Sequence, residues 1–352
     1  MGLTDELARR GEIGGRTVHI TERGEVACAT YPVADLAPGM VRVRTDVSVV
    51  SPGTEMTYIG RDASNPYLHK TWDPALRIFT AGAPRQDYPV VFGYRAAGTV
   101  VETQDANVKV GTRVFGKWRH TEYTTMAAAD ARAQRLPNDL SLDDGADLER
   151  MLPIALNAVA FAEGQHAGAP AVVFGCGPVG LMLAQVARAT GASRVYAVDR
   201  LAQRLAIASS LGLEALDAAE DVALRLKREH GAEGIPVAFE CSGSARALND
   251  AIRVVRRRGL VVAVGFYQRD AAGLFLGEEF HHNGVEIRSG QIGNLHPSVD
   301  AASLRAKAVE LARAKSVVLG GLPRLRLPVE RAAEAFAALA RPADVLQVAF
   351  SY

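Results

Sequence analysis

Three glycines near the middle of the chain have the spacing of a loop that binds a dinucleotide. Gly175, Gly177 and Gly180 fit the pattern G-x-G-x-x-G, follow a short apolar run at 170–175 and open a segment with helical spacing. An acid, Asp199, ends the next apolar run about 20 residues further on, as the dinucleotide pattern requires. The first glycine permits a tight turn, the second lets the backbone approach a pyrophosphate, and the third lets the helix pack closely on the strand.

We expect the whole loop, the acid and their neighbours to line the cofactor. An acid at this place accepts hydrogen bonds from the ribose hydroxyls and repels a 2′-phosphate, which favours NAD over NADP. Two arginines nearby leave NADP as an alternative cofactor, since arginine pairs well with phosphate. The two cysteines can equally be small buried apolar residues. The residues assigned to the cofactor are Gly175, Cys176, Gly177, Pro178, Val179, Gly180, Asp199, Arg200, Arg204 and Cys241.

Strands and helices alternate around this loop. Apolar runs predict buried strands, and segments of helical spacing that end on glycine predict helices. Strands are expected at 170–175, 194–199, 236–243 and 260–265, and helices at 178–191, 201–212, 220–231 and 245–259. Strands that alternate with helices form a parallel sheet covered on both faces. We therefore expect an α/β fold built on a Rossmann, doubly wound parallel sheet.

The parts before and after this region differ from it. The first third is rich in short β-type runs broken by Pro, Gly and Asp, which predicts a β-rich unit. One connection in it, 61–88, is long, and long loops in compact domains are often functional. The end of the chain, 327–352, reads as a strand, a helix and a strand.

The bulk composition excludes several classes of function. Lys and Arg number 40 and Asp and Glu 39, so the net charge of +1 offers no basic excess for nucleic acid or anionic lipid. No stretch approaches the roughly 20 apolar residues of a membrane helix, and the N-terminus has no apolar signal core. We therefore expect a cytoplasmic protein. Cys28, Cys176 and Cys241 are scattered and predict no disulfide framework.

Taken in order, these segments resemble the medium-chain dehydrogenase/reductase superfamily of zinc alcohol dehydrogenase-like proteins. The resemblance is carried by segments 40–55, 88–102, 110–116, 172–199 and 328–351. It implies a GroES-like catalytic domain made of 1–155 and 296–352, with the Rossmann domain, 156–295, inserted between them. It also implies a small-molecule substrate and a homodimer or homotetramer, for which 260–265 is a candidate edge strand.

The positions that the resemblance assigns to zinc ligands carry other residues. Ser51 and Pro52 stand for the first ligand, Tyr94 followed by Arg95 for the second, and only Glu149 and Arg150 lie near the third. No four-cysteine lobe is present, and the spacing of His69, His120, His281 and His282 gives no zinc signature. We therefore expect no zinc. The chain resembles zinc-less branches, among them bacteriochlorophyllide dehydrogenase-like and sugar- or cyclitol-pathway members.

Without a metal, a side chain must exchange the proton while hydride moves to or from nicotinamide. Tyr94 is a candidate acid or base, with Arg95 lowering its pKa or stabilising an oxyanion directly. Thr54 matches a proton-relay hydroxyl of the family, and Glu55 and Ser51 complete the candidate catalytic set. Each residue also has a structural alternative. These are a packed side chain for Tyr94, an ion pair for Arg95, a turn hydroxyl for Thr54, a salt bridge for Glu55 and a turn cap for Ser51.

Candidate substrate contacts come from three places. The long loop offers Tyr67, His69 and Trp72, and the third ligand position offers Glu149. His281 and His282 follow the Rossmann core, where the family brings a loop near the nicotinamide. For a lone loop histidine, plain exposure is the alternative.

These features favour an NAD-dependent, zinc-independent dehydrogenase. It would interconvert a secondary alcohol and a ketone on a sugar-like, cyclitol or natural-product substrate. Two other functions stay open. One is a C=C reductase of the quinone or enoyl type, and the other is a protein that keeps the nucleotide without turnover.

Overall fold

The computed structural model describes residues 14–61, 68–81, 88–268, 270–341 and 343–352, and two compact units divide the chain. The first unit is Met1–Arg150 with Pro323–Tyr352, and the second is Met151–Leu322. The segment 296–322 therefore lies in the second unit, whereas the expected boundary assigned it to the catalytic domain. The physical reason is the helix α11, Ala301–Arg313, which packs against α5, Met151–Phe161.

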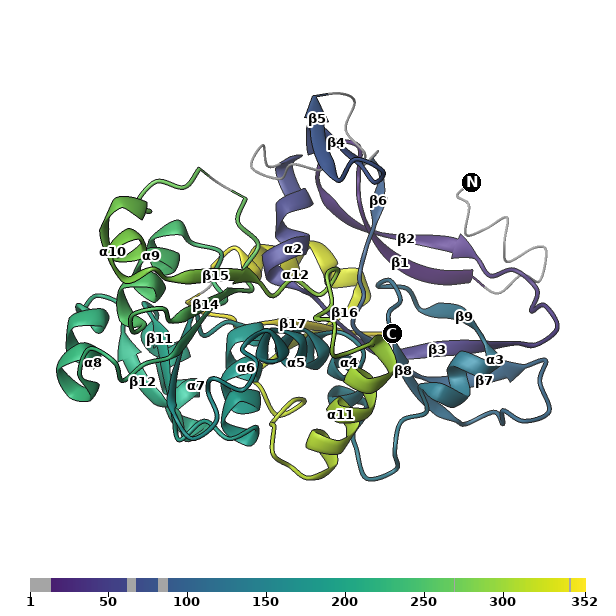
Figure 1. Cartoon of the computed structure of the whole chain (residues 1–352). Helices are drawn as coiled ribbons and strands as arrows, with labels where there is room; N and C mark the ends of the chain where they lie inside the picture. The colour runs from purple at the N-terminus through teal and green to yellow at the C-terminus, as the bar shows by residue number, and fades with distance from the viewer. Residues whose placement is uncertain (1–13, 62–67, 82–87, 269, 342) are drawn as a thin grey trace. The chain divides into compact units, whose positions relative to one another are not determined.

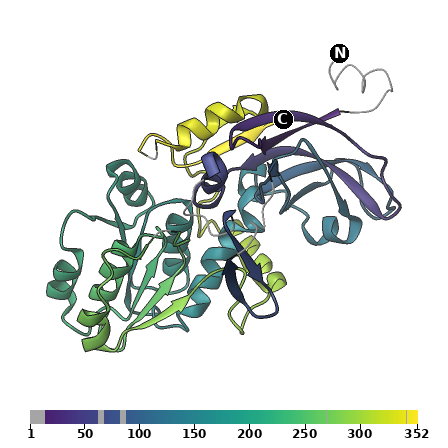
Figure 2. The same cartoon turned by 90° about the horizontal axis from the view of Figure 1, so that it is seen from above.

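The second unit is a parallel six-stranded sheet in the order β12-β11-β10-β13-β14-β15 (Figures 1 and 2). Its strands are β10 Pro170–Phe174, β11 Arg194–Asp199, β12 Glu214–Asp217, β13 Val237–Glu240, β14 Leu260–Ala263 and β15 Glu286–Ser289. The order reverses between β10 and β13, which makes the carboxyl end of β10 the switch point where such sheets bind ligands. The predicted α/β alternation is confirmed.

Helices lie on both faces of this sheet (Figure 2). They are α6 Pro178–Ala189, α7 Ala202–Ser210, α8 Val222–His230, α9 Ala245–Val254 and α10 His281–Asn283, besides α5, α11 and the short turn η3, Leu276–Phe280. Val172 and Phe174 face a core formed with α8 and α9, while the alternate residues Ala171 and Val173 are also buried. Burial of both faces explains why β10 is apolar throughout.

The expected edge strand is not at the edge. Segment 260–265 forms β14, which pairs with β13 on one side and with β15 on the other. The sequence prediction missed β15 because Glu286–Ser289 is short and mostly polar. The prediction that copies of the chain pair through 260–265 is therefore wrong, because this strand has no free edge. The homo-oligomer itself stays a prediction.

The first unit is mainly β-structure, as predicted. Its larger sheet has the order β16-β17-β3-β7-β8, with β9 also on β3, and a smaller sheet has the order β2-β1-β6. The strands are β1 Gly14–Ile20, β2 Val26–Pro32, β3 Met40–Val49, β6 Val90–Val91, β7 Ala96–Thr103, β8 Arg113–Gly116, β9 Tyr123–Ala127, β16 Leu325–Pro328 and β17 Val348–Ser351, with a separate hairpin of β4 Lys70–Asp73 and β5 Ile78–Ala81.

Short helices connect these strands. They are α2 Pro52–Glu55, η1 Met56–Arg61, α3 Ala128–Ala133, α4 Leu142–Leu148, η4 Val329–Arg331 and α12 Ala332–Leu339. The C-terminal strand, helix and strand were predicted, and β17 joins the sheet beside β3. Among the described helices of the chain, none has the length and apolar character needed to cross a membrane.

Candidate active site

The glycine loop has the backbone that its sequence predicts. Gly175 follows β10 with φ +94°, and a Cβ there would meet the Ser242 nitrogen at 2.8 Å. A Cβ at Gly180 would meet the Gly175 oxygen at 1.8 Å, whereas a Cβ at Gly177 would meet nothing within 4 Å. The first and third glycines are therefore fixed by packing, and the second borders open space.

The amino end of α6 fits an anion. Gly177 is the N-cap residue and gives no side-chain cap, and Pro178 occupies the first turn. Backbone N–H groups of a first helical turn lack partners within the helix and attract negative charge together with the helix dipole. The loop therefore fits the pyrophosphate of a dinucleotide, with Val179 and Gly180 contributing the N–H groups.

Asp199 lies beside this loop and is almost fully buried. Its Oδ2 accepts a hydrogen bond from the Cys176 nitrogen at 2.7 Å, and its Oδ1 accepts one from the Leu201 nitrogen at 2.9 Å. A carboxylate has about four acceptor positions, so capacity for ribose hydroxyls remains. Arg204 Nη1 lies 3.7 Å from Oδ2, while Arg200 is exposed. Arg204 thus lies close enough to Asp199 to leave binding of a 2′-phosphate possible.

The two cysteines near the loop have a packing role. Cys176 is buried, and burial raises the pKa of its thiol to about 12. Burial also raises the pKa of Cys241 well above its ordinary value, and a Cβ at Gly180 would lie 3.4 Å from the Cys241 Cβ. Thiols held in the neutral form are poor nucleophiles.

A second acid at the same edge of the sheet escaped the sequence analysis. Glu240, the last residue of β13, accepts hydrogen bonds from the Ser242 nitrogen at 2.7 Å and the Gly243 nitrogen at 3.0 Å, and from the hydroxyls of Ser242 and Tyr267. Burial raises the pKa of Glu240. Its signal was present, because an acid that ends the strand next to β10 must face the switch point.

His281 and His282 do not lie where they were expected. They are exposed and precede β15, and the backbone oxygen of Asn283 accepts from the Arg258 nitrogen at 2.8 Å, before β14 begins. In a parallel sheet this is the amino-terminal edge, opposite the glycine loop. Segment 290–296 instead leaves the carboxyl end of β15. Asn157 holds it through Gly290 O at 3.3 Å and His296 N at 2.9 Å.

In the first unit, three hydroxyl-bearing residues of the candidate catalytic set come together. Gly93, with φ +115°, turns the chain next to His120, and the half-buried Tyr94 follows it directly. The hydroxyls of Ser51 and Thr54, at the start of α2, lie close enough to Tyr94 to lower the pKa of its phenol. The structure thus places Tyr94 within a cluster of hydroxyls.

Arg95 lowers the pKa of Tyr94, as expected, but burial outweighs it and the net shift is upward. Burial raises the pKa of Tyr94, and the charge of Glu55 raises it further, while the neighbouring hydroxyls and Arg95 oppose this only in part. The phenol is therefore held in its protonated form. A protonated phenol is a proton donor and not a ready base.

Arg95 does not face a substrate. Its guanidinium is completely buried, and it donates from Nε to Asp147 at 2.9 Å, from Nη1 to the Val50 oxygen at 3.1 Å and from Nη2 to Gln347 at 3.0 Å. A second ion pair runs from Arg324 to the other oxygen of Asp147. Sequence adjacency to Tyr94 suggested catalysis, but the side chain points into the core of the unit and holds its parts together.

Glu55 has a structural role as a paired acid, which was the alternative to a catalytic role. Its Oε1 accepts from the Ser51 nitrogen at 2.9 Å, and its Oε2 lies 2.9 Å from His120 Nε2. His120 Nδ1 lies 2.7 Å from Ser48 Oγ, which in turn lies 2.7 Å from the Tyr352 hydroxyl. This buried chain fixes α2, and with it the hydroxyls that contact Tyr94.

The third ligand position holds one acid and one cation. Glu149 is buried, with Lys117 Nζ at 3.8 Å from its Oε1. The Arg150 guanidinium lies over the ring of Tyr94, 5.5 Å from its centroid. Arg150 thus joins the Tyr94 cluster, although it was not among the predicted site residues. Its position next to Glu149, near the third ligand position, was the available signal.

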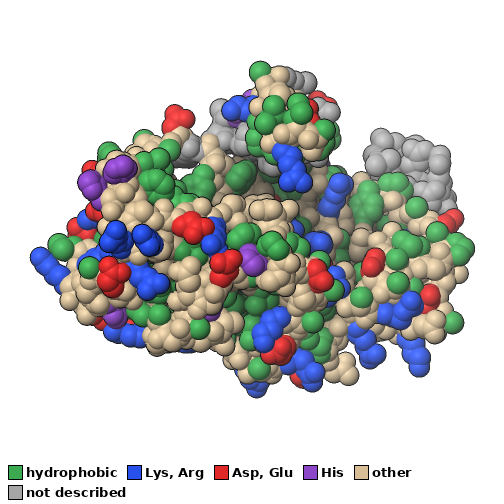
Figure 3. All heavy atoms as spheres, in the orientation of Figure 1, with side chains coloured by type: hydrophobic (Ala, Val, Ile, Leu, Met, Phe, Trp, Pro, Cys, Tyr) green, Lys and Arg blue, Asp and Glu red, His purple; other side chains and the backbone are tan. Residues whose placement is uncertain are grey.

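Trp72 belongs to the hairpin β4–β5, His69 directly precedes it, and Tyr67 lies outside the described residues. His69 is exposed, and Trp72 packs on Phe79 with ring centroids 5.0 Å apart. Hydrophobic side chains are visible over this hairpin (Figure 3). Leu76, between its two strands, is exposed. No described contact links these residues to Tyr94, so their substrate role stays a prediction.

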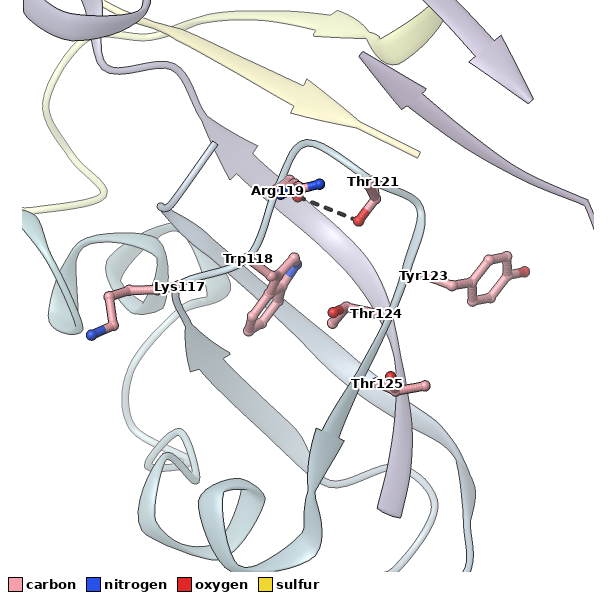
Figure 4. Close-up of a pocket in the computed structure, with 7 residues that line it drawn as sticks. All are labelled: Lys117, Trp118, Arg119, Thr121, Tyr123, Thr124 and Thr125. Atoms are coloured by element: carbon pink, nitrogen blue, oxygen red, sulfur yellow. Dashed lines mark hydrogen bonds between the residues drawn. The ribbon is translucent and has the colours of Figure 1, made fainter. Parts of the chain in front are cut away.

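A shallow pocket of about 410 Å³ opens on the β9 side of the first unit (Figure 4). It is lined by Lys117, Trp118, Arg119, Thr121, Tyr123, Thr124 and Thr125. The indole Nε1 of Trp118 already donates to Thr45 Oγ1 at 2.9 Å.

Charged side chains of both signs are interspersed on the face shown in Figure 3, which agrees with the net charge of +1.

The residues near Tyr94 do not fit a zinc ion. Zinc takes about three Cys, His or carboxylate ligands from the protein, but Ser51, Tyr94 and Arg150 offer hydroxyls and a cation. Glu55 and His120 are already bonded to each other in the core. Throughout the described ranges, no three His, Cys, Asp or Glu side chains gather in a way that could hold a metal.

Comparison with known proteins agrees with this architecture. Residues 178–304 match the model of the family "Zinc-binding dehydrogenase". The chain is 30% identical over 231 residues to (R,R)-butanediol dehydrogenase of Bacillus subtilis, covering 57% of this chain and 63%, less than two thirds, of that relative. It is 28% identical over 271 residues to D-guloside 3-dehydrogenase of Escherichia coli, covering 74% and 76%. The solved structure of 2R,3R-butanediol dehydrogenase from Bacillus subtilis superposes with a TM-score of 0.75 at 21% identity, over 96% and 99% of the chains.

Proposed function

The chain belongs to the zinc-binding dehydrogenase family of the medium-chain dehydrogenases/reductases, and from this premise we propose that it is an NAD-dependent oxidoreductase. It interconverts a secondary alcohol and a ketone on a polyol or sugar-like substrate, and it does so without zinc. The relatives support the reaction class, since their names describe dehydrogenases of a diol and of a guloside.

The observation that carries the zinc-independent part is the side-chain set around Tyr94. The hydroxyls of Ser51 and Thr54 lie beside its phenol and lower its pKa, and Arg150 lies over its ring. Ser51, Tyr94 and Arg150 stand at or beside positions where the family resemblance places ligands, yet their chemistry suits proton transfer and charge stabilisation better than metal binding.

NAD(H), when bound, supplies or accepts the hydride. In the direction of ketone reduction, the Tyr94 phenol donates its proton to the substrate oxygen, and the product is the alcohol. Burial supports this role because it keeps the phenol protonated. The hydroxyls of Ser51 and Thr54 lie beside the phenol and relay a proton from solvent to the phenolate after turnover.

The preference for NAD rests on Asp199. The carboxylate beside the glycine loop would repel a 2′-phosphate, and Arg204 at 3.7 Å offsets this repulsion in part. Measuring kcat/KM for both cofactors with one substrate decides between them.

The proposal is tested on the purified protein by elemental analysis combined with NADH binding and a substrate panel. We expect NADH binding, less than about one tenth of an equivalent of zinc per chain, and oxidation of a polyol. Stoichiometric zinc that activity requires would refute the zinc-independent mechanism. Reduction of an α,β-unsaturated ketone with no alcohol oxidation would instead show a C=C reductase. NADH binding with no turnover across the panel would show a nucleotide-binding protein.

A further inference from the structure

The Arg150 guanidinium is a cation without an acidic partner. Its Nε is buried and has no hydrogen-bond partner, and within the described parts of the chain no carboxylate lies at ion-pair distance from it. Burial lowers the pKa of Arg150 by disfavouring its charge. Arginine nevertheless stays protonated in proteins, so a partly desolvated positive charge lies beside Tyr94.

The charged side chains near Arg150 interact with other residues. Arg95 is paired with Asp147, and Glu55 accepts from the Ser51 nitrogen and contacts His120. Glu149 precedes Arg150 and raises its pKa electrostatically, but its carboxylate faces Lys117 at 3.8 Å. A partly buried charge without a partner is costly, and a ligand that brings the opposite charge removes that cost.

The placement of Arg150 separates it from the reacting oxygen. The guanidinium lies over the ring face of Tyr94, 5.5 Å from the centroid, and not at the hydroxyl. The hydroxyl is the end of the side chain that meets Ser51 and Thr54. An anion held by Arg150 would therefore lie beside the ring, while the substrate oxygen meets the phenol.

We propose that Arg150 binds a permanently anionic group of the substrate, a carboxylate or a phosphate, next to the proton-donating Tyr94. The substrate class is then a hydroxylated acid or a phosphorylated polyol. This inference rests on the proposed function. A planar guanidinium recognises both anions through paired N–H donors, so carboxylate and phosphate share the chemistry.

The first test needs no turnover. Malonate and inorganic phosphate are titrated separately, at constant ionic strength, into wild type, Arg150→Gln, Arg150→Lys and the control Arg135→Gln, an exposed arginine of the same unit. We expect saturable binding of at least one anion, weakened about tenfold or more by Arg150→Gln, less by Arg150→Lys and not by the control. The anion that binds identifies the class. No saturable binding to wild type, or equal binding to Arg150→Gln, overturns the proposal.

The second test uses pairs of substrates that differ in charge, such as a sugar acid and the corresponding alditol. Arg150→Gln should lower kcat/KM for the acid about tenfold or more relative to the alditol, chiefly through KM. Equal losses for both would overturn the proposal and assign Arg150 to the reacting oxygen or to stability. If no member of any pair is oxidised, the proposed function fails, while the titration still decides the anion site. The Tm of Arg150→Gln without ligand should fall only slightly, because the contact with the Tyr94 ring is lost but no ion pair is.

Discussion

Arg95 and Asp147 form an ion pair from which solvent is completely excluded, with both side chains at 0% exposure. Asp147 also pairs with Arg324, so two arginines share this one carboxylate. Asp147→Asn should therefore destabilise the protein by about 3–5 kcal/mol, because it leaves buried charge unpaired. Urea unfolding followed by circular dichroism measures this loss.

A matched control for this variant is Glu334→Gln. Glu334 pairs with Arg331, and both side chains are more than half exposed. Exposed pairs contribute less than about 1 kcal/mol, so this variant should unfold nearly like wild type. Equal stability of Asp147→Asn and Glu334→Gln would contradict the structural role assigned to Arg95.

Tyr94→Phe tests the proton donor. Removing the hydroxyl leaves the ring to pack under Arg150 but removes the donated proton, so kcat should fall about 10²- to 10⁴-fold. The KM for substrate should change less than about threefold. Steady-state kinetics with saturating NADH measures both, with Tyr123→Phe as the control outside the cluster. An unchanged kcat would exclude Tyr94 from the chemical step.

The pH dependence follows from the direction of the Tyr94 pKa. Burial raises this pKa above the ordinary tyrosine value of about 10, so the protonated donor persists throughout the neutral and mildly alkaline range. Ketone reduction should therefore show no loss from Tyr94 below about pH 10, whereas alcohol oxidation should increase toward alkaline pH. Profiles of kcat in both directions, corrected for stability of the protein, test this sign. A fall of reduction near neutrality, present in wild type and absent in Tyr94→Phe, would show a lowered pKa instead.

Gly177→Asp should abolish dinucleotide binding while the fold survives. A Cβ at this position meets nothing within 4 Å, so the new side chain is tolerated, but its carboxylate opposes the pyrophosphate. NADH binding by fluorescence titration should weaken about a hundredfold or more. Gly177→Ala is the neutral control and should retain much of the affinity. NADH affinity equal to wild type in Gly177→Asp would remove the loop from the cofactor site.

Asp199→Asn should shift cofactor preference toward NADP. The amide oxygen can still accept a backbone hydrogen bond, but the negative charge that repels a 2′-phosphate is gone. We expect the ratio of kcat/KM for NADP to that for NAD to rise about tenfold. Asp217→Asn, at the register position paired with Asp199 but exposed, should leave the ratio unchanged. If both variants keep the wild-type ratio, selectivity lies elsewhere.

Local pattern determined the dinucleotide half of this protein. Glycine spacing and the alternation of strands and helices are properties of short segments, because a turn with φ above zero and a helix start depend on neighbouring residues. Gly175, Gly180 and Asp199 therefore lie where the sequence predicts. The chain order of β10, α6 and β11 also forces the loop to the carboxyl edge of the sheet.

Tertiary structure decided the direction in which polar side chains point. Tyr94 and Arg95 are neighbours in sequence, yet one joins a hydroxyl cluster and the other pairs with Asp147, 52 positions away. The pairing of Glu55 with His120 spans 65 positions. His281 and His282 were placed from their sequence position after the Rossmann core, and only the parallel register of β15 shows that they occupy the opposite edge. Burial and long-range pairing depend on which segments pack together, and residue type and spacing alone do not specify that.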